Sequence, residues 1–443
     1  MEKQYPPKSQ PSAKRTPSAN EHSDSPSLPN GSAPLLDQIP AYLQIRQQLS
    51  YLDVLGVDNP FDRVHEDLSV DCVTVNGRRC INFAGYNYLG LSGHPEVSAA
   101  AKAAIDRYGT AASGSRMIAG QTPLHLELEH EIAATLGVDD CLVFTGGHST
   151  NVDTIGHLFG RKDLLVHDSL VHQSMVGGCQ LAGGRRMHFP HNNWEALDQI
   201  LTDNRRKYRY ALVLVEGVYS TEGDIAELPK LISIKKRHNA FLFVDEAHSF
   251  GVLGERGFGV VEHFGLDPND VELWMGTLSK TMASCGGYIA GKAGMVGYLR
   301  LSVPGSVFAS LMSPPNAAAA LSALRVMKAE PERVARLRAR SRLFLELARA
   351  HNLTTGTSHD SPIVPVITGD PVLAVQLSGE LLKKGIAVQP MVHPAVDHSA
   401  SRLRFFINTL HSEEQIRIAV DAVTRLKSEL RPSRPDMALA DNL

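Results

Sequence analysis

An alternation of helical and strand signals between residue 83 and about residue 312 most constrains what this chain can fold into. Apolar residues recur every four positions at Leu124, Leu128, Ile132 and Leu136, as on one face of a helix. Continuous apolar runs follow at 141–144, 211–215 and 241–244. Strands that are apolar on both faces are typical of a parallel sheet covered by helices. We therefore expect an α/β domain with right-handed crossovers over residues 83–314.

The segments before this domain differ from it in composition. Residues 1–33 are rich in Pro, Ser, Asn and Lys and contain almost no large apolar residue. Because such a segment cannot bury enough surface to offset its ordering entropy, we expect a disordered tail. Residues 34–82 form an N-terminal segment. It is predicted to hold a first helix from Leu35 to about Tyr51 and short strands around the turn Asn76-Gly77.

The character of the chain changes after the α/β domain. A long Ala/Leu/Arg-rich helical region at about 315–350 precedes strands near 364–367 and 403–407. A final helix is expected to start at Ser412, where Ser-Glu-Glu-Gln forms a capping box. These elements predict a smaller C-terminal α+β domain over residues 315–430. Residues 431–443 resemble the first tail.

The bulk composition excludes several classes of protein. The 443 residues carry a net charge of −3, so neither nucleic acid nor an anionic membrane is an expected partner. The N-terminus has no apolar signal region, and no stretch has the length to span a bilayer. The five cysteines are scattered and form no close-spaced Cys/His quartet, so we expect reduced thiols, no metal site and a cytoplasmic protein.

Two polar residues, Asp245 and Lys280, are separated in the sequence by about the length of one βαβ step. Asp245 ends the run at 241–244, and ligands of open α/β sheets bind at such strand ends. Lys280 lies 35 residues further on, in Gly-Thr-Leu-Ser-Lys. Each has an ordinary alternative: Asp245 could cap the next helix, and Lys280 could be a solvated surface charge. Together they indicate pyridoxal 5′-phosphate (PLP), whose protonated pyridine nitrogen needs a carboxylate and whose aldehyde needs a nucleophilic amine.

Other polar residues are suited to the same cofactor. The strand 141–144 runs into Thr-Gly-Gly-His-Ser, and backbone N–H groups at a helix N-terminus bind phosphate. The hydroxyls of Thr277 and Ser279 are suitable phosphate ligands. His172 could stack on the pyridine ring, and Ser220 could hydrogen-bond the phenolic oxygen beside His248. A tight strand–helix turn and a structural histidine are the alternative interpretations.

These segments resemble the α-oxoamine synthase family of fold-type-I PLP enzymes. The likeness runs from about residue 38 to 430 and rests on six motifs in the same order. They are Tyr-Asn-Tyr-Leu-Gly-Leu (86–91), Gly-Ser-Arg-Met-Ile-Ala-Gly (114–120), Glu-Gly-Val-Tyr-Ser (216–220), Val-Asp-Glu-Ala-His (244–248), Gly-Thr-Leu-Ser-Lys (276–280) and Arg-Leu-Arg-Phe (402–405). The resemblance implies an aspartate-aminotransferase-like large domain with a mainly parallel sheet and a smaller C-terminal α+β domain.

The resemblance also implies a role for each matching residue. Lys280 would bind PLP covalently and carry the reacting proton, and Asp245 would pair with the pyridine nitrogen. The catalytic group would then be Lys280, Asp245, His172 and His248, with His172 on the ring and His248 and Ser220 at the phenolic oxygen. Gly147, His148 and Thr277 would help to hold the phosphate, beside the hydroxyl of Ser279 named above. His148 stands where relatives more often have Phe or Tyr. Tyr86 and Arg404 would bind the amino-acid substrate, Arg404 through its carboxylate.

The family is dimeric, with active sites shared across the interface, which implies a homodimer. Ser310 would reach the phosphate of the neighbouring subunit, although Phe-Ala-Ser-Leu-Met-Ser-Pro-Pro departs from the usual Ser-Leu-Pro-Pro. Tyr86 and the stretch around Glu216 are similar to serine palmitoyltransferases, and residues 388–396 resemble polyketide-associated relatives.

The expected reaction is the decarboxylative condensation of a small amino acid with an acyl thioester on CoA or acyl-carrier protein. Serine is favoured, and glycine or alanine is possible. The alternatives are a PLP aminotransferase or aldolase on the same fold, or a non-catalytic partner subunit.

Overall fold

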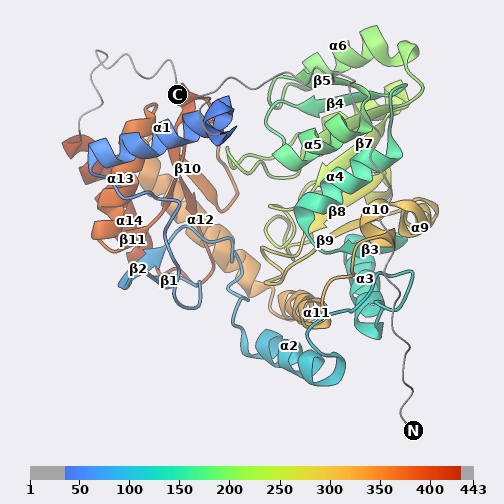
Figure 1. The fold of residues 1–443 in the computed structure, drawn as a ribbon, viewed down its shortest axis with the longest axis horizontal. Coiled ribbons are helices and arrows are strands. Elements are labelled where there is room, and N and C mark those ends of the chain that lie inside the picture. Colours follow the sequence, from blue (N-terminus) through green and yellow to red (C-terminus); the bar gives the residue numbers. More distant parts are fainter. Residues whose placement is uncertain (1–34, 431–443) are drawn as a thin grey trace, which may run out of the picture. The chain divides into compact units, whose positions relative to one another are not determined.

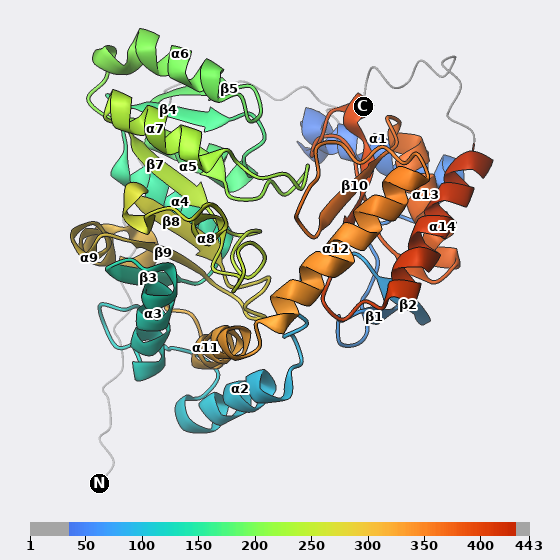
Figure 2. The same ribbon diagram turned by 180° about the vertical axis from the view of Figure 1, so that it is seen from behind.

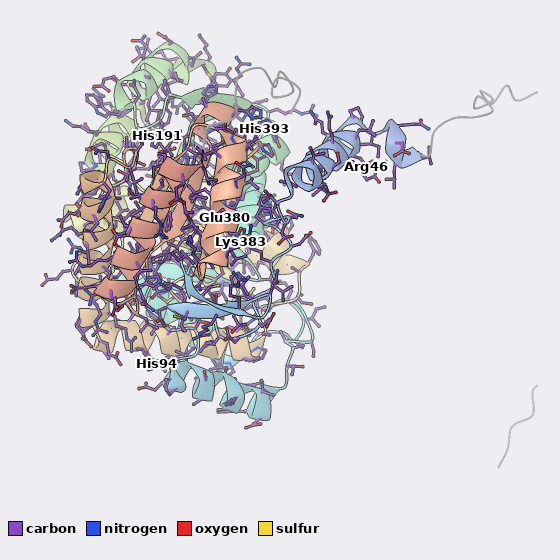
Figure 3. All side chains as sticks on the ribbon, turned by 90° about the vertical axis from the view of Figure 1, so that its left-hand side faces the viewer. Arg46, His94, His191, Glu380, Lys383 and His393 are labelled. Carbon is purple, nitrogen blue, oxygen red and sulfur yellow. The ribbon has the colours of Figure 1, made fainter. Side chains whose placement is uncertain are left out.

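The computed structural model describes residues 35–430. The two predicted tails, 1–33 and 431–443, lie outside the described residues. The chain divides into two compact units, and the boundary between them in the sequence lies between Tyr51 and Leu52. The first contains the short 3-10 helix Leu35–Gln38 and most of helix α1, Pro40–Leu55. The expected single helix is thus interrupted at Pro40, which has no N–H for a preceding turn and starts a new helix instead. Within this unit Arg46 forms an ion pair with Asp37 at 3.0 Å (Figure 3).

A seven-stranded sheet with the order β3-β9-β8-β7-β6-β4-β5 forms the centre of the second unit (Figure 1). Its strands are β3 (Asp140–Phe144), β4 (Leu164–Asp168), β5 (Arg185–Phe189), β6 (Ala211–Glu216), β7 (Phe241–Asp245), β8 (Leu273–Thr277) and β9 (Gly287–Gly291). Strands β5, β4, β6, β7 and β8 pair in parallel, whereas β9 runs antiparallel to both β8 and β3. The predicted mainly parallel sheet is confirmed, and the strands expected at the three apolar runs are β3, β6 and β7.

Helices cover both faces of this sheet. The helices of this region are α2 (Pro95–Tyr108), α3 (Pro123–Leu136), α4 (Gly147–Leu158), α5 (Gln173–Ala182), α6 (Trp194–Asn204), α7 (Leu228–His238), α8 (Val260–Phe264), α9 (Ala293–Ser302), α10 (Pro304–Val307) and α11 (Pro314–Ala329), with 3-10 turns Arg205–Lys207 and Pro268–Asp270. Figure 1 shows α4 and α5 in front of the sheet, and Figure 2 shows α7 and α8 over the opposite face. Strands β4, β6 and β7 are buried almost throughout, because both of their faces are covered.

Two three-stranded sheets and three helices form the C-terminal part. The sheets have the orders β1-β2-β11 and β10-β13-β12. The elements are β1 (Cys72–Val75), β2 (Arg78–Asn82), α12 (Glu332–Ala350), β10 (Ile363–Ile367), α13 (Pro371–Lys383), β11 (Ile386–Ala387), β12 (Gln389–Met391), the 3-10 turn His398–Ala400, β13 (Arg402–Phe406) and α14 (Glu413–Glu429). The hairpin expected around Asn76-Gly77 is β1–β2, and it joins this part through β11.

The long helical region expected at 315–350 is two helices. The chain breaks between α11 and α12 at Pro331, since proline removes a helical hydrogen bond and disfavours helix at the residue before it. Val334 and Leu337, in the first half of α12, belong to the core around the large sheet, whereas Phe344 and Ala348 belong to the C-terminal core. Helix α12 therefore contributes its first half to one core and its second half to the other.

The final helix forms as the sequence predicts. Ser412 caps α14, and its side chain and that of Gln415 form the reciprocal hydrogen bonds of a capping box. The predicted face, Ile416, Ala419, Val420, Val423 and Leu426, is buried. All five cysteines are free. Within residues 35–430, no helix has the length and apolar character needed to cross a membrane.

Candidate active site

The C-terminal ends of three neighbouring parallel strands bring the central polar residues together. Glu216 ends β6 and pairs in register with Asp245, which ends β7. Asp245 in turn pairs with Met275 of β8, and β8 ends at Thr277, three residues before Lys280. Because parallel strands end at one edge of the sheet, residues far apart in the sequence meet there.

The carboxylate of Asp245 is buried, with 3% of the residue exposed, and is held at both oxygens. The Asn151 side-chain amide donates a hydrogen bond to Oδ2 at 2.8 Å, and the backbone N–H of Ala247 donates to Oδ1 at 2.9 Å. Asn151 also donates to the hydroxyl of Ser174, which lies 2.7 Å from Nδ1 of His172. This chain of contacts fixes the carboxylate and the nearby imidazole relative to each other.

Lys280 is half-buried, and its amine lies close enough to Asp245 for the two charges to interact. Burial lowers the pKa of Lys280 to about 8, although the negative charges of Asp245 and Glu216 act in the opposite direction. Its Nζ atom lies 5.6 Å from the ring centre of Tyr86. A lysine with this pKa has a substantial neutral fraction near physiological pH and can act as a nucleophile or base.

His248 is also buried beside these groups. Burial, with the positive charges of Lys280 and Arg404, holds the pKa of His248 well below its usual range, so the ring is neutral. Its Nδ1 atom lies 2.7 Å from the hydroxyl of Tyr88. The ring centre of Tyr86 lies 5.9 Å away in an edge-on arrangement.

A cradle for an anion lies where α4 begins. Helix α4 starts at Gly147 with Gly146 as its N-cap, so its first N–H groups are free to bind. A side chain at Gly147 would place its Cβ only 2.7 Å from Oγ1 of Thr277, so only glycine leaves this space open. The Thr277 and Ser279 hydroxyls lie 2.8 Å apart. The ring of His148, in the first turn, lies 6.5 Å from that of His172.

Arg404 of β13 enters the site from the C-terminal part. One guanidinium nitrogen donates to the backbone carbonyl of Ser220 at 2.8 Å, and another donates to the Tyr86 hydroxyl at 3.4 Å. The guanidinium also lies over the ring of Phe406, at 4.7 Å. Arg404 forms no ion pair within the described chain. Its charge is therefore available to an incoming carboxylate.

One predicted residue is not joined to this cluster. Ser310 is exposed, and the contacts that connect the other predicted residues do not include it. Its segment instead runs beside residue 114, where Leu311 donates a backbone hydrogen bond to Gly114 at 3.0 Å. The other predicted residues converge on the strand ends of the large sheet, but their roles toward a cofactor or substrate remain predictions.

Three site residues were missed in the sequence: Tyr88, Asn151 and Glu216. Tyr88 and Glu216 stand inside the motifs 86–91 and 216–220, and Asn151 follows the Thr-Gly-Gly-His-Ser turn by two residues, but none of the three has a spacing that reveals its partner. Asn151 meets Asp245 across 94 positions, and Tyr88 meets His248 across 160. The one available signal was position: Asn151 lies one helical turn after Gly147 and on the same side of α4.

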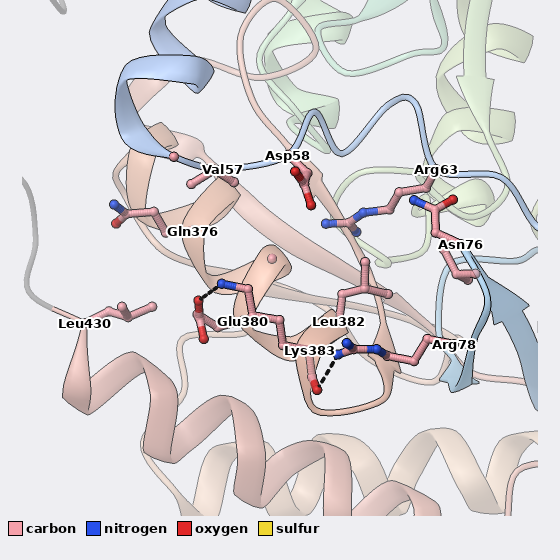
Figure 4. A pocket seen from close by; sticks show the side chains of 13 residues that line it. Val57, Asp58, Arg63, Asn76, Arg78, Gln376, Glu380, Leu382, Lys383 and Leu430 are labelled. Atoms are coloured by element: carbon pink, nitrogen blue, oxygen red, sulfur yellow. Dashed lines mark hydrogen bonds and ion pairs between the residues drawn. The ribbon is translucent and has the colours of Figure 1, made fainter.

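A cavity of about 390 Å³ lies elsewhere, between the β1–β2 turn and α13. Figure 4 shows Arg63, Arg78 and Lys383 among its charged lining residues. Lys383 is paired with Glu380 at 2.7 Å, and Arg78 donates to the Lys383 carbonyl at 2.7 Å. None of the predicted site residues lines this cavity.

The strand-end residues fit PLP. The buried carboxylate suits the pyridine nitrogen, the lysine of lowered pKa suits the aldehyde, and the glycine cradle with its hydroxyls suits the phosphate. With the mainly parallel sheet and the C-terminal α+β part, they define a PLP enzyme of fold type I. The aminotransferase class I and II family matches residues 78–423.

Comparisons with known proteins narrow the class. The chain is 34% identical to 8-amino-7-oxononanoate synthase 1 of Bacillus subtilis, covering 83% of this chain and 93% of that protein. It is 35% identical to serine palmitoyltransferase 3 of Caenorhabditis elegans, over 79% of this chain and 71% of that one. The solved Sphingomonas wittichii serine palmitoyltransferase superposes with a TM-score of 0.84 at 31% identity, covering 90% of this chain and 99% of that one. The chain belongs to the α-oxoamine synthases, PLP-dependent enzymes of the aminotransferase class I and II family.

Proposed function

We propose that this enzyme condenses a small amino acid with an acyl thioester and releases CO₂, a free thiol and an α-aminoketone. The observation that carries the proposal is the convergence of Lys280, Asp245 and Arg404 at one edge of the sheet. This reaction requires a base of lowered pKa, a fixed carboxylate and an arginine that is free to bind a carboxylate, and Arg404 forms no ion pair with residues 35–430. The relatives named above, 8-amino-7-oxononanoate synthases and serine palmitoyltransferases, belong to the same reaction class.

Binding of the amino acid rests on Arg404. Its guanidinium forms a bidentate ion pair with the substrate carboxylate, and the Tyr86 hydroxyl lies beside it. This pair orients the bond between Cα and the carboxylate before that bond breaks. Tyr86 also favours serine as the amino donor, by its similarity to serine palmitoyltransferases, with glycine and alanine as the other candidates.

PLP, when bound, supplies an electron sink that stabilises negative charge at Cα. Asp245 would pair with its ring nitrogen, and His172 would cover one face of the ring. His248 and Ser220 would hydrogen-bond its phenolic oxygen. The start of α4 and nearby hydroxyls would hold its phosphate, namely Gly147, His148, Thr277 and Ser279, and Ser310 of the partner subunit would reach the phosphate from across the interface.

Lys280 moves the protons. Its neutral Nζ takes the proton from Cα and returns one to Cα after CO₂ has left. Between these transfers a bond forms from Cα to the acyl carbon, the C–S bond breaks and the sulfur leaves as a thiolate, which takes a proton from solvent. Burial lowers the pKa of Lys280 to about 8, so part of the lysine is neutral and can take the first proton. The ammonium group that results holds this proton and can give it back to Cα.

We also propose that the enzyme is a cytoplasmic homodimer. Large apolar side chains lie exposed on adjoining loops and on α9: Met117 and Ile118 (51% and 84% exposed), Phe308 (82%) and Leu301 (66%). The loops adjoin through the Leu311–Gly114 hydrogen bond. Exposed apolar groups of this size are typical of a protein interface. Free cysteines are consistent with a reducing compartment.

The test is a matrix of amino acids against acyl donors. Serine, glycine and alanine are each offered with acyl-CoA and acyl-carrier-protein donors, and aminoketones are identified by mass spectrometry. Amino acids labelled with ¹⁴C at the carboxyl carbon provide the control. Release of labelled CO₂ only when a thioester is present supports the condensation. Amino transfer to an oxo acid, or cleavage of the bond between Cα and Cβ, without release of labelled CO₂ would instead support an aminotransferase or aldolase. No turnover with any pair would favour a non-catalytic subunit.

A further inference from the structure

Glu216 is a buried carboxyl group to which the proposed reaction gives no role. It ends β6 beside Asp245, and 2% of the residue is exposed. Burial and the neighbouring Asp245 raise the pKa of Glu216 to about 8. Its Oε2 atom accepts a hydrogen bond from the backbone N–H of Ser220 at 3.1 Å. Burying a carboxyl group costs folding free energy, so the contacts that Glu216 makes indicate its role.

The backbone of Ser220 connects this acid to Arg404. The N–H of Ser220 donates to Glu216, while its carbonyl accepts from Arg404 at 2.8 Å. Ser220 lies in a tight loop, closed by the bridge between Val218 and Ile225 and by the hydrogen bond from Gly223 to the Tyr219 carbonyl at 2.9 Å. A shift of the Ser220 N–H therefore moves the carbonyl that holds the guanidinium.

Arg402, two residues before Arg404 on the same strand, shows how an arginine is held when a carboxylate contacts it directly. Arg402 is buried and forms a direct ion pair with Glu222 at 2.7 Å, and it donates further hydrogen bonds to backbone carbonyls. Its charge is thus satisfied within the protein. Within residues 35–430, the hydrogen bonds of the Arg404 guanidinium go to neutral acceptors, the Ser220 carbonyl and the Tyr86 hydroxyl. A carboxylate in direct contact would compete with the substrate's carboxylate for the same guanidinium.

We infer that Glu216 is a positioning residue that holds Arg404 for the substrate carboxylate through the backbone of Ser220, without neutralising the guanidinium. This inference rests on the proposed role of Arg404 in binding that carboxylate. Glu216 acts on Arg404 through Ser220 and does not touch the guanidinium, so its acceptor oxygen matters more than its charge. Its loss should weaken binding of ligands with a carboxylate and spare ligands without one.

The test compares an amino acid with the amine that lacks only its carboxyl group. Serine is paired with ethanolamine, alanine with ethylamine and glycine with methylamine. Dissociation constants are measured from the visible absorbance of the PLP-loaded enzyme. Glu216→Leu removes the acceptor and should raise the dissociation constant of the amino acid about tenfold, the effect of one hydrogen bond. The dissociation constant of the amine should change by less than about twofold. Glu216→Gln keeps an acceptor oxygen and should bind both nearly as the wild type does.

A matched control is available in Glu246. It is also a buried acid, directly after β7, but its hydrogen bonds come from Val260 and Ser249. Glu246→Gln should leave the preference for the amino acid over the amine unchanged. If Glu216→Leu does not fold, Glu216→Ala tests the same acceptor.

Equal losses for the amino acid and the amine in Glu216→Leu would overturn the inference, as would a loss of selectivity in Glu216→Gln. The variant Arg404→Gln distinguishes a failure of this inference from a failure of the proposed function. If Arg404→Gln weakens the amino acid no more than the amine, the assigned role of Arg404 fails. If it weakens the amino acid selectively and Glu216→Leu does not, only the role of Glu216 fails.

Discussion

The hydroxyl of Tyr88 lies 2.7 Å from Nδ1 of His248, and both residues are buried. Burial raises the pKa of Tyr88 well above its usual range, so the hydroxyl keeps its proton. Nδ1 is the only hydrogen-bond acceptor that the described residues offer to that proton. Tyr88 therefore donates to Nδ1, and the neutral ring carries its own proton on Nε2. This tautomer presents a donor to the oxygen that His248 is proposed to contact.

Tyr88→Phe should weaken PLP binding about fivefold to tenfold, because a buried Nδ1 without a donor costs roughly 1 kcal/mol or more and no longer favours one tautomer. Equilibrium titration of the apoenzyme with PLP, followed by absorbance, measures the change. Tyr288→Phe is the matched control, since Tyr288 is fully buried and its hydroxyl has no hydrogen-bond partner among residues 35–430. Equal PLP affinities in the two variants would contradict this account of Tyr88.

Gly147→Ala should lower the affinity for PLP and leave the fold intact. The added methyl group would lie 2.7 Å from Oγ1 of Thr277, so the threonine must move out of the cradle. We expect a rise of about tenfold or more in the PLP dissociation constant, the cost of overpacking a site by one methyl group. Gly160→Ala, where no atom lies within 4 Å of the new methyl, should bind PLP as the wild type does. Inorganic phosphate should protect the apoenzyme less in Gly147→Ala than in Gly160→Ala during thermal denaturation.

The sequence was most informative where a local pattern determines local structure. The apolar runs predicted β3, β6 and β7, and Ser412 predicted the start of α14, because burial on both faces and capping chemistry are local. The direction of β9 was not predictable, since antiparallel pairing with β8 and β3 depends on where the chain returns in space. Strands β11 and β12 are too short to give a periodic signal.

The residues of the site also differ in whether a local sequence pattern predicts them. Lys280 and Asp245 were found because each has a recognisable neighbourhood in the sequence. Asn151, Tyr88 and Glu216 were not, because they act on another residue rather than on a ligand. Their partners come from other elements, and one sequence does not specify such contacts. The supporting residues of a site are thus harder to predict than the residues they support.

Uptake of PLP by the apoenzyme should depend on pH through Lys280. Only the neutral amine attacks an aldehyde, so the rate should rise with pH and level off above a midpoint near the pKa of about 8. An ordinary lysine would give a midpoint above 10. Because Asp245 acts to raise this pKa, Asp245→Asn should move the midpoint to lower pH. Stopped-flow absorbance between pH 6.5 and 9.5 provides the profile. Lys280→Ala should form no covalently bound cofactor, whereas Lys292→Ala, at an exposed lysine, should behave as the wild type.

The last prediction concerns His191, which bridges two buried aspartates next to the Ser220 loop (Figure 3). Its Nδ1 pairs with Asp168 at 3.0 Å and its Nε2 with Asp224 at 2.9 Å. Asp224 in turn accepts from Thr357 of the C-terminal part at 2.9 Å. Burial acts to lower the pKa of His191, but the hydrogen bonds to Asp168 and Asp224 outweigh it and raise the pKa to about 10.

Since the folded pKa of His191 exceeds its unfolded value of about 6.5, protonated His191 stabilises the fold most below pH 6.5. This contribution declines as the pH rises toward 10. His191→Gln leaves two buried carboxylates without their cation and should lower the free energy of unfolding by about 3 kcal/mol at pH 6. The deficit should shrink at pH 9.5. Chemical denaturation of wild type and variant at both pH values measures it, with His238→Gln, an ion-paired histidine on α7 away from the loop, as the control. A deficit that stayed constant or grew with pH would show that the His191 charge does not hold this loop.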